Sequence, residues 1–230
     1  SENACLGCMA YAAFRLGDWK QSTKLARQVQ AKDESNLFAS AGLGLVYTMR
    51  GQVKQARRSL ESVALGAQEK GITPIELVVA PALAQLDHYT NAHTAAISRF
   101  RGLLKQWEST EDCFDSLFGL CLAATFFGEH ELRDELSSTA SSIQRIVSQN
   151  RNPESMGSLA HVSGEIALLE GHFSDAATNF LQSRTHFQKI NVRYDIARSE
   201  YRTGIALLQG KSFDSGIEYL KRAHAGASKL

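Results

Sequence analysis

Small and apolar residues alternate with short polar turns along the chain, and one such pattern occurs twice. The segment GEIALLEGHFSDAATNF, residues 164–180, has a counterpart in GIALLQGKSFDSGIEYL, residues 204–220. In both segments an apolar run leads into a turn with glycine, and a second run with apolar residues follows the turn. A segment that recurs after about forty residues predicts a repeated structural unit.

Four further turns of the same kind extend the repeat over the whole chain. Aligned on the turn residue, the six turns are Gly17, Gly51, Asn91, Gly128, Gly171 and Gly210. The intervals between them are 34, 40, 37, 43 and 39 residues, which is the range of helical repeat arrays. We therefore expect six repeats, each built from two helices joined at one of these turns.

The residues on both sides of each turn predict how the two helices pack. A small residue precedes the turn in every repeat: Ala10, Gly44, Ala84, Cys121, Gly164 and Gly204. A residue that is small in most repeats follows the turn: Ser22, Ala56, Ala96, Arg133, Ala176 and Gly216. Four residues later stand mostly large apolar residues: Ala26, Leu60, Phe100, Ser137, Phe180 and Leu220. Small residues allow two antiparallel helices to approach closely, and each hairpin must then stack on a neighbour to cover its apolar face.

This pattern resembles the tetratricopeptide repeat (TPR), most clearly in residues 11–27, 44–60 and 164–180. The resemblance implies an all-α fold, a right-handed superhelical solenoid of about six antiparallel helical hairpins. It implies a single TPR-like repeat domain over residues 1–230, which we expect to be a fragment of a larger protein because the chain lacks an initiator methionine. Asn91, Arg133 and Ser137 depart from the pattern and make the third and fourth hairpins the least typical.

A second, weaker resemblance concerns residues 167–176, whose pattern ALLEG-x-F-x-x-A is similar to the repeat segments of LuxR-type bacterial transcriptional regulators, including the maltose-regulon activator. It implies a sensor segment of a transcriptional or signalling regulator, whose DNA-binding and nucleotide-binding parts would lie outside these residues.

Helix-end signals agree with the predicted hairpins. Thr73-Pro74-Ile75-Glu76 predicts an N-cap followed by a first-turn proline and a reaching glutamate, and Asn152-Pro153 predicts a similar start. Pro81 falls inside a predicted helix, where its ring and missing amide hydrogen should kink or interrupt the helix.

Composition and charge narrow the partners. The chain is 43% hydrophobic and 21% charged with a net charge of +1, which gives no global electrostatic reason to expect nucleic acid or a membrane surface as a partner. No apolar run is long enough to span a bilayer, and no signal peptide is visible, so we expect a cytoplasmic location. The terminal Ser228-Lys229-Leu230 matches a peroxisomal address, but it would act only at a true C-terminus.

Several short motifs approach a chemical signature without completing it. Cys5 and Cys8 have the spacing of half a metal or redox site, but no second pair follows, so we expect buried, reduced cysteines. GIALLQGKS at residues 204–212 is one residue too long for a phosphate-binding loop and follows a helix. His130-Glu131 begins an HExxH pattern that lacks its second histidine. We therefore predict no enzyme, no metal site and no cofactor.

The remaining candidate site is the inner surface formed by the first helix of each hairpin. The repeat register predicts a charged and aromatic lining in the third to sixth hairpins, formed by Gln85, His88, Tyr89, Asp115, Phe118, Leu122, His161, Glu165, Arg198 and Tyr201. Such mixed linings are typical of recognition sites. The first two hairpins offer Gly7, Tyr11, Ala41 and Leu45 instead, which does not suit the carboxylate clamp of chaperone-binding TPR proteins.

We therefore expect a non-catalytic binding or sensor module that accepts a peptide, a protein element or a small ligand in this groove. The main alternative is a passive assembly adaptor that forms homo-oligomers through its exposed repeat ends or its convex face. An enzyme with a site built in the groove is the third reading, and no motif supports it.

Overall fold

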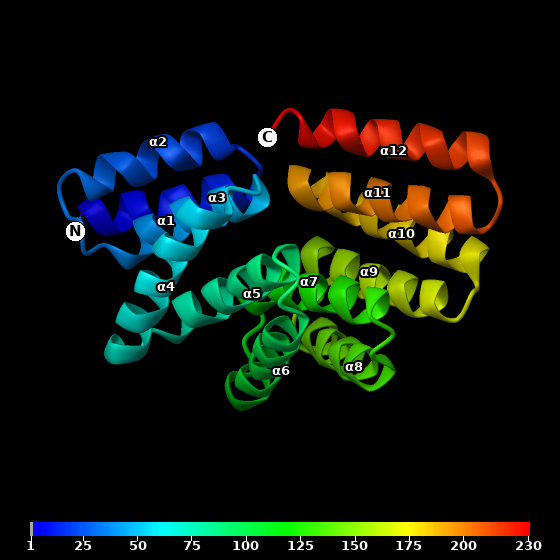
Figure 1. The fold of residues 1–230 in the computed structure, drawn as a ribbon, viewed down its shortest axis with the longest axis horizontal. Helices are drawn as coiled ribbons and strands as arrows, with labels where there is room; N and C mark the ends of the chain where they lie inside the picture. The colour runs from blue at the N-terminus through cyan, green and yellow to red at the C-terminus, as the bar shows by residue number, and fades with distance from the viewer. Residues whose placement is uncertain (1) are drawn as a thin grey trace. The chain divides into compact units, whose positions relative to one another are not determined.

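The computed structural model describes residues 2–230, with the side chains of Asn3 and Ala4 left out. Over this range the chain forms twelve α-helices and no β-strand (Figure 1). The all-α class predicted from the sequence is confirmed. Consecutive helices pair through short turns, as the hairpin pattern predicts.

The chain divides into two compact units, residues 1–109 and residues 110–230. Unit 1 contains α1 (Glu2–Arg15), α2 (Trp19–Gln30), α3 (Leu37–Met49), α4 (Val53–Lys70), α5 (Thr73–Tyr89) and α6 (His93–Thr110), the last residue of which belongs to unit 2. Unit 2 contains α7 (Ser116–Glu129), α8 (Arg133–Gln149), α9 (Pro153–Leu169), α10 (Phe173–Lys189), α11 (Arg193–Gln209) and α12 (Phe213–Ala227).

Within each unit a helix packs against its partner in the hairpin and against the next hairpin. In unit 1, α3 contacts α1 and α2 on one side and α4 and α5 on the other. In unit 2, α9 contacts α7 and α8 as well as α10, and α10 in turn contacts α11, which pairs with α12. The first helices of neighbouring hairpins therefore lie in one layer, and this layer positions the candidate site.

The turns follow a stricter period than the sequence alignment indicated. Residues with a left-handed backbone recur every 40 residues, namely Gly51, Asn91, Glu131, Gly171 and Lys211. Each is followed by an amide that reaches back across the helix end, for example from Ser212 to the carbonyl of Leu207 at 2.8 Å. This bond closes the last helical turn as in a Schellman motif, and it is formed in the same way by glycine and by other residues.

Two of the turn residues predicted from the sequence were therefore wrong. Gly128 lies inside α7, where Glu131 takes the left-handed conformation, and Gly210 has φ of −76°, where Lys211 takes it. The alignment favoured glycine because a left-handed backbone strains other side chains. The helix-closing bonds outweigh that strain here.

The corrected period changes the irregularity of the fourth hairpin, which has Leu136 at the position that is small in the other hairpins and Ala140 at the position that is mostly large. Shifted by three residues, its inward position is Leu136, which is buried, while Arg133 and Ser137 are exposed. Close helix approach is seen where the pattern predicts it, since a Cβ added to Gly164 would lie 2.6 Å from Cε1 of Phe180.

The helix-end predictions had mixed outcomes. Asn152 caps α9 as predicted, accepting from the amide of Ser155, whose hydroxyl in turn accepts from the Asn152 amide. Thr73 is not a cap, because α5 starts one residue earlier than predicted, with Ile72 in the cap position and no side-chain cap bond. Helix α5 also continues through Pro81, and it is not interrupted because buried residues of this helix hold it against α3 and α4.

Cys5 and Cys8 contradict the expectation of buried cysteines, since both are free thiols exposed on α1. Among the helices of residues 2–230, none has the length and apolar character needed to cross a membrane.

Candidate partner-binding pocket

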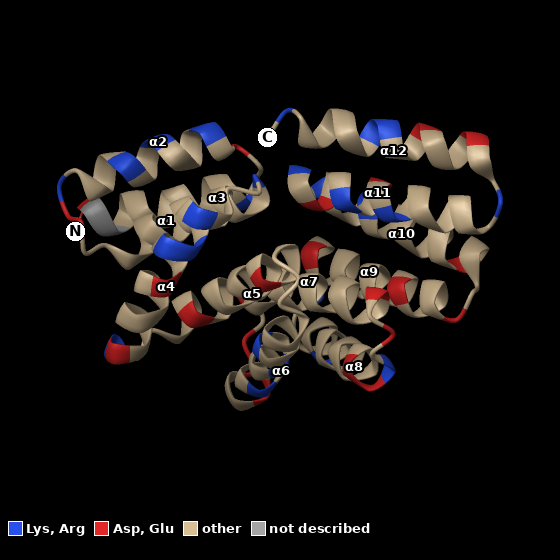
Figure 2. Ribbon diagram, viewed as in Figure 1, with Lys and Arg blue, Asp and Glu red and all other residues tan. Residues whose placement is uncertain are grey.

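The 40-residue period brings equivalent positions of α7, α9 and α11 to the same side of unit 2. Thr125 and Glu165 are separated by one period, and so are Leu122, Val162 and Arg202. Because stacked repeats place equivalent side chains beside one another, a polar residue at one level meets the polar residue of the next. Helix α11 is also rich in charge, and its arginine, aspartate and glutamate residues all lie within residues 193–202 (Figure 2).

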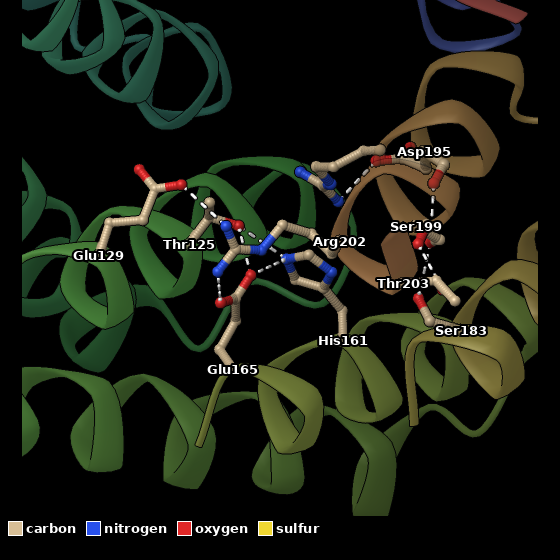
Figure 3. Close-up of polar contacts among 10 residues, drawn as sticks. Thr125, Glu129, His161, Glu165, Ser183, Asp195, Ser199, Arg202 and Thr203 are labelled. Atoms are coloured by element: carbon tan, nitrogen blue, oxygen red, sulfur yellow. Dashed lines mark hydrogen bonds and ion pairs between the residues drawn. The ribbon is translucent and has the colours of Figure 1, made fainter. Parts of the chain in front are cut away.

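Arg202 is the centre of a polar cluster that joins the three helices. Its guanidinium donates to Oε2 of Glu165 on α9 and, at 2.8 Å, to Oε1 of Glu129 on α7 (Figure 3). The side chain of Arg202 is 4% exposed and that of Glu165 is fully buried, whereas that of Glu129 is 36% exposed. The two terminal nitrogens of the guanidinium thus each bind a carboxylate, and loss of the arginine would leave the buried Glu165 without its cation.

His161 and Thr125 complete this cluster, which we call the Arg202 network (Thr125, Glu129, His161, Glu165 and Arg202). The Thr125 hydroxyl donates to Oε1 of Glu165 at 3.0 Å and lies 2.8 Å from Nε2 of His161. Because a hydroxyl has one hydrogen and Thr125 uses it on Glu165, the imidazole donates its Nε2 hydrogen to Thr125. The network therefore fixes one tautomer of a neutral imidazole.

The burial of these groups shifts their protonation in opposite directions. Burial lowers the pKa of His161 well below its usual value, and the positive charges of Arg198 and Arg202 lower it further. Burial raises the pKa of Glu165, although the guanidinium of Arg202 opposes that shift. At neutral pH His161 is therefore uncharged.

Arg198 belongs to a second buried contact on α11. Its guanidinium lies 2.6 Å from Oδ1 of Asp195 and 5.7 Å from the centre of the Tyr194 ring. Beyond it, the hydroxyl of Ser199 lies 3.2 Å from that of Ser183 on α10 (Figure 3). The Arg198–Asp195 contact lies within α11, and the Ser199–Ser183 contact joins α11 to the preceding hairpin.

A pocket of about 410 Å³ opens above the Arg202 network. We call it the acidic pocket. Glu165 and Arg202 form part of its wall, and Leu168, Leu169 and Ile205 supply apolar surface. Its outer rim is formed by exposed side chains, namely Glu129, Glu131, Tyr201 and Gln209.

The composition of the acidic pocket indicates which ligands suit it. Three carboxyl groups, from Glu129, Glu131 and Glu165, face a single guanidinium. Two of the three already bind Arg202, so Glu131 and the exposed part of Glu129 are the groups that can meet a ligand. A cationic group with an apolar stem would place its charge on these carboxylates and its stem against the leucines and Ile205.

The structure places the predicted groove residues of unit 2 in different environments. His161, Glu165 and Arg198 are buried, and so are Phe118 and Leu122. Asp115 is half-buried at the start of α7, and Tyr201 is 46% exposed at the mouth of the acidic pocket. The structure brings together His161 and Glu165, with Tyr201 beside the same pocket. Most of these residues therefore lie below the protein surface. Tyr201 is the exposed member of this set and can contact a partner directly.

The three predicted residues of unit 1 lie on α5. Gln85 and His88 are half-buried, and Tyr89 is 46% exposed. The imidazole of His88 lies 6.1 Å from the ring of Tyr89 and 5.9 Å from that of His93, measured between ring centres. A binding role for these residues stays a prediction.

Thr125, Glu129, Glu131 and Arg202 were not predicted from the sequence. Arg202 could have been found, because it lies two 40-residue periods after Leu122, which was part of the predicted lining. The uneven turn spacing taken from the glycines hid that equivalence. Glu129 and Glu131 had no sequence signal, since exposed glutamates are common near helix ends.

Comparison with solved structures shows a likeness of fold. No protein-family model matches the chain, and no curated protein sequence matches it. Among solved structures, the chain is similar to BtubC (BKLC) from P. vanneervenii, with a TM-score of 0.53 and 14% sequence identity. The alignment covers 93% of this chain and 90% of that one. The likeness therefore extends over nearly all of both chains and concerns the helical fold alone.

Proposed function

We propose that this chain is a non-catalytic binding module of the tetratricopeptide type, whose hairpins stack as a solenoid. The acidic pocket accepts a basic side chain, lysine or arginine, of a peptide or protein partner. The mechanism is recognition: the apolar wall takes the aliphatic stem, and Glu129 and Glu131 take the charge.

The observation on which this proposal depends most is that the buried Arg202 already binds two carboxylates, the exposed Glu129 and the buried Glu165, while the exposed Glu131 lines the same pocket. Because Arg202 is already neutralised, the pocket presents excess negative charge to solvent. The two-carboxylate contact also fixes the side chain of Glu129, so that part of the pocket is ordered before a partner arrives. Pre-ordered groups lose less conformational entropy on binding.

The 40-residue period and the close Gly164–Phe180 contact support the repeat assignment. The similarity to BtubC supports a helical fold of this size, and at 14% identity it supports nothing about the ligand. A binding role rather than an enzymatic one agrees with the burial of His161, whose imidazole has no exposed surface from which to act on a substrate.

The proposal is tested with a ligand that isolates the side chain. N-acetyl-argininamide is titrated into ¹⁵N-labelled protein, with N-acetyl-norleucinamide as the uncharged probe. We expect amide shifts at Tyr201, Gln209 and Glu131 with the arginine compound alone, with a Kd in the range of about 1 mM. Glu131→Lys should abolish them, whereas Asp134→Lys, the same charge change on exposed α8, should not.

Equal shifts with both compounds, or shifts that survive Glu131→Lys, would show that the acidic pocket is not a site for basic side chains.

A further inference from the structure

Helix α1 carries an apolar stripe that the other described helices of unit 1 leave uncovered. Cys5, Cys8, Met9, Ala12 and Leu16 are all exposed, with Met9 at 54% and Leu16 at 48%. Their spacing of three, four and seven residues places them along one side of the helix. Large apolar side chains aligned in this way mark a contact surface more often than isolated ones do.

A second uncovered surface lies between α11 and α12. A groove of about 470 Å³ opens there, and we call it the terminal groove. Small and apolar residues dominate its lining, which includes Ala197, Tyr201, Leu220, Ala223 and Ala227. The groove is separate from the acidic pocket, although Tyr201 borders both.

In the preceding hairpin, the equivalent surface of α9 and α10 is covered by the next helix, α11. Helix α11 lies on the surface of α9 and α10, where Ser199 meets Ser183 at 3.2 Å and Glu200 pairs with Arg184 at 2.9 Å. Further along α11, Ala206 packs in one apolar cluster with residues of α9 and α10, including Phe180. The seat on α9 and α10 is thus filled by a first helix that contacts it through Ser199 and Ala206, with Thr203 fully buried between them.

Residues of the terminal groove occupy the positions that follow those of the α9–α10 seat by 40 residues. Phe180, Ser183 and Phe187 become Leu220, Ala223 and Ala227, all of which line the groove. The terminal groove is therefore the equivalent of the α9–α10 seat without its occupant.

Counting back from the turn residue of each hairpin identifies the matching face of α1, because the first interval, from Gly17 to Gly51, is 34 residues and not 40. Counted from the left-handed residues Gly17 and Lys211, the positions of Ser199, Thr203 and Ala206 correspond to Cys5, Met9 and Ala12. These three residues belong to the exposed α1 stripe. Helix α1 thus presents to solvent the face that α11 buries.

The substitutions on the two surfaces are complementary. The internal contact between Ser199 and Ser183 becomes Cys5 opposite Ala223, so a polar pair changes to an apolar pair on both sides. Thr203 becomes Met9, a longer apolar side chain, and Phe180, which packs in one cluster with Ala206 one turn further along α11, becomes the smaller Leu220. Larger side chains on α1 therefore coincide with smaller ones in the terminal groove.

We propose that the α1 stripe of one copy of this chain docks in the terminal groove of a second copy, head to tail. The docked helix continues the repeat stacking, with Cys5 against Ala223 and Met9 beside Leu220. The contact joins two different surfaces, so each copy has one helix to offer and one groove to fill, and assembly proceeds beyond a dimer unless a ring closes. It does not depend on the acidic pocket.

Sedimentation equilibrium over about 10 µM to about 1 mM tests the association. We expect the wild-type chain to form concentration-dependent oligomers, and Met9→Glu and Ala227→Glu each to weaken self-association at least tenfold. Both positions are exposed, so neither substitution should unfold the chain. Leu65→Glu, at a 63% exposed leucine on α4, is the control that should leave association unchanged.

A mixture of the two variants separates this geometry from a symmetric dimer. The Met9→Glu chain keeps an intact groove and the Ala227→Glu chain keeps an intact α1, so the mixture should form a 1:1 dimer that neither chain forms alone. A symmetric contact through either surface would give no such dimer.

Disulfide trapping tests the register. Under a mild thiol oxidant, Ala223→Cys should form an intermolecular disulfide with the native Cys5, with two thiols losing two hydrogens to the oxidant. The cross-link should vanish in Cys5→Ser, and Ala225→Cys, exposed outside the groove lining, should form at least tenfold less. A monomer at every concentration, or equal cross-linking at residues 223 and 225, overturns the proposal.

Discussion

Each unit of the molecule has an ion-pair network that joins several helices around one buried charged side chain, but the central charges of the two networks have opposite sign. In unit 1 the buried group is Asp87 on α5, which accepts from Arg57 on α4 at 2.7 Å and from Arg99 on α6 at 2.8 Å. We call these three residues the Asp87 network. In unit 2 the buried group is Arg202, which binds two glutamates.

The difference decides which charge reaches the surface. The two arginines of the Asp87 network are 30% and 39% exposed, so unit 1 presents positive charge where unit 2 presents the carboxylates of Glu129 and Glu131. The networks also join different helices. Asp87 ties a first helix to two second helices, whereas Arg202 ties three first helices, and this is where the acidic pocket opens. Similar chemistry thus stabilises both units, and in unit 2 the network also forms part of the wall of the acidic pocket.

Arg202→Met gives the largest expected effect. It leaves the carboxyl of Glu165 buried without its cation, which should destabilise unit 2 by about 3–5 kcal/mol. Urea unfolding followed by far-UV circular dichroism measures the loss, and hydrogen exchange should show it in α9 and α11. The double variant Arg202→Met/Glu165→Leu, which removes both charges, should recover much of the loss. A double variant as unstable as the single one would contradict the charge explanation.

Asp87→Asn should cost less, about 1–2 kcal/mol, because Arg57 and Arg99 can turn toward water once their partner is neutral. Trp19 and Trp107, the two tryptophans of the chain, both lie in unit 1. Tryptophan fluorescence should therefore detect the Asp87→Asn change in full and respond less to Arg202→Met. A cost for Asp87→Asn as large as that for Arg202→Met would remove the contrast between the networks.

Acid should weaken unit 2 through His161. Its lowered pKa means that below about pH 6.5 the unfolded chain binds a proton that the folded imidazole refuses, so stability falls with pH, by up to about 2 kcal/mol at pH 5. Arg198, Arg202, Thr125, Glu165 and Cys121 surround this imidazole.

Glu165, whose pKa is raised, acts with the opposite sign, since its contribution to stability is present at low pH and is lost as pH rises through the folded pKa. The informative quantity is therefore the difference between wild type and His161→Gln, measured by urea unfolding from pH 7.5 to pH 5. That difference should shrink as pH falls. A constant difference would mean that His161 titrates alike in both states.

Glu129→Gln should have the smallest effect on stability, about 0–1 kcal/mol, because this side chain is partly exposed and Glu165 still binds Arg202. The same change should nevertheless weaken binding of N-acetyl-argininamide severalfold, since it removes a carboxylate from the acidic pocket. Thermal unfolding and the amide titration together separate the two roles, with Glu108→Gln on exposed α6 as the matched control. Unchanged arginine binding would limit the cationic site to Glu131.

Local signals predicted the helices well and the turns less well. Gly164 and Phe180 predicted a close helix pair because the small residue and the large one fit only each other. Gly128 misled the alignment, since a glycine inside a helix resembles a turn glycine in sequence, and only hydrogen bonding identified Glu131 as the turn residue. The candidate site was predicted in part: His161 and Glu165 were found, but their burial and their link to Arg202 were not.

The sequence by itself determined the all-α class, the hairpins and the side of each hairpin that carries polar residues, because these depend on spacing within about forty residues. Only the tertiary structure decided that Arg202 lies between Glu129 and Glu165, that His161 is sealed from solvent, and that the α1 stripe and the terminal groove are uncovered. The physical reason is that charge pairing and burial depend on which helices stack, and on how far each side chain reaches. Residues 73 positions apart, such as Glu129 and Arg202, meet only after the repeats have packed.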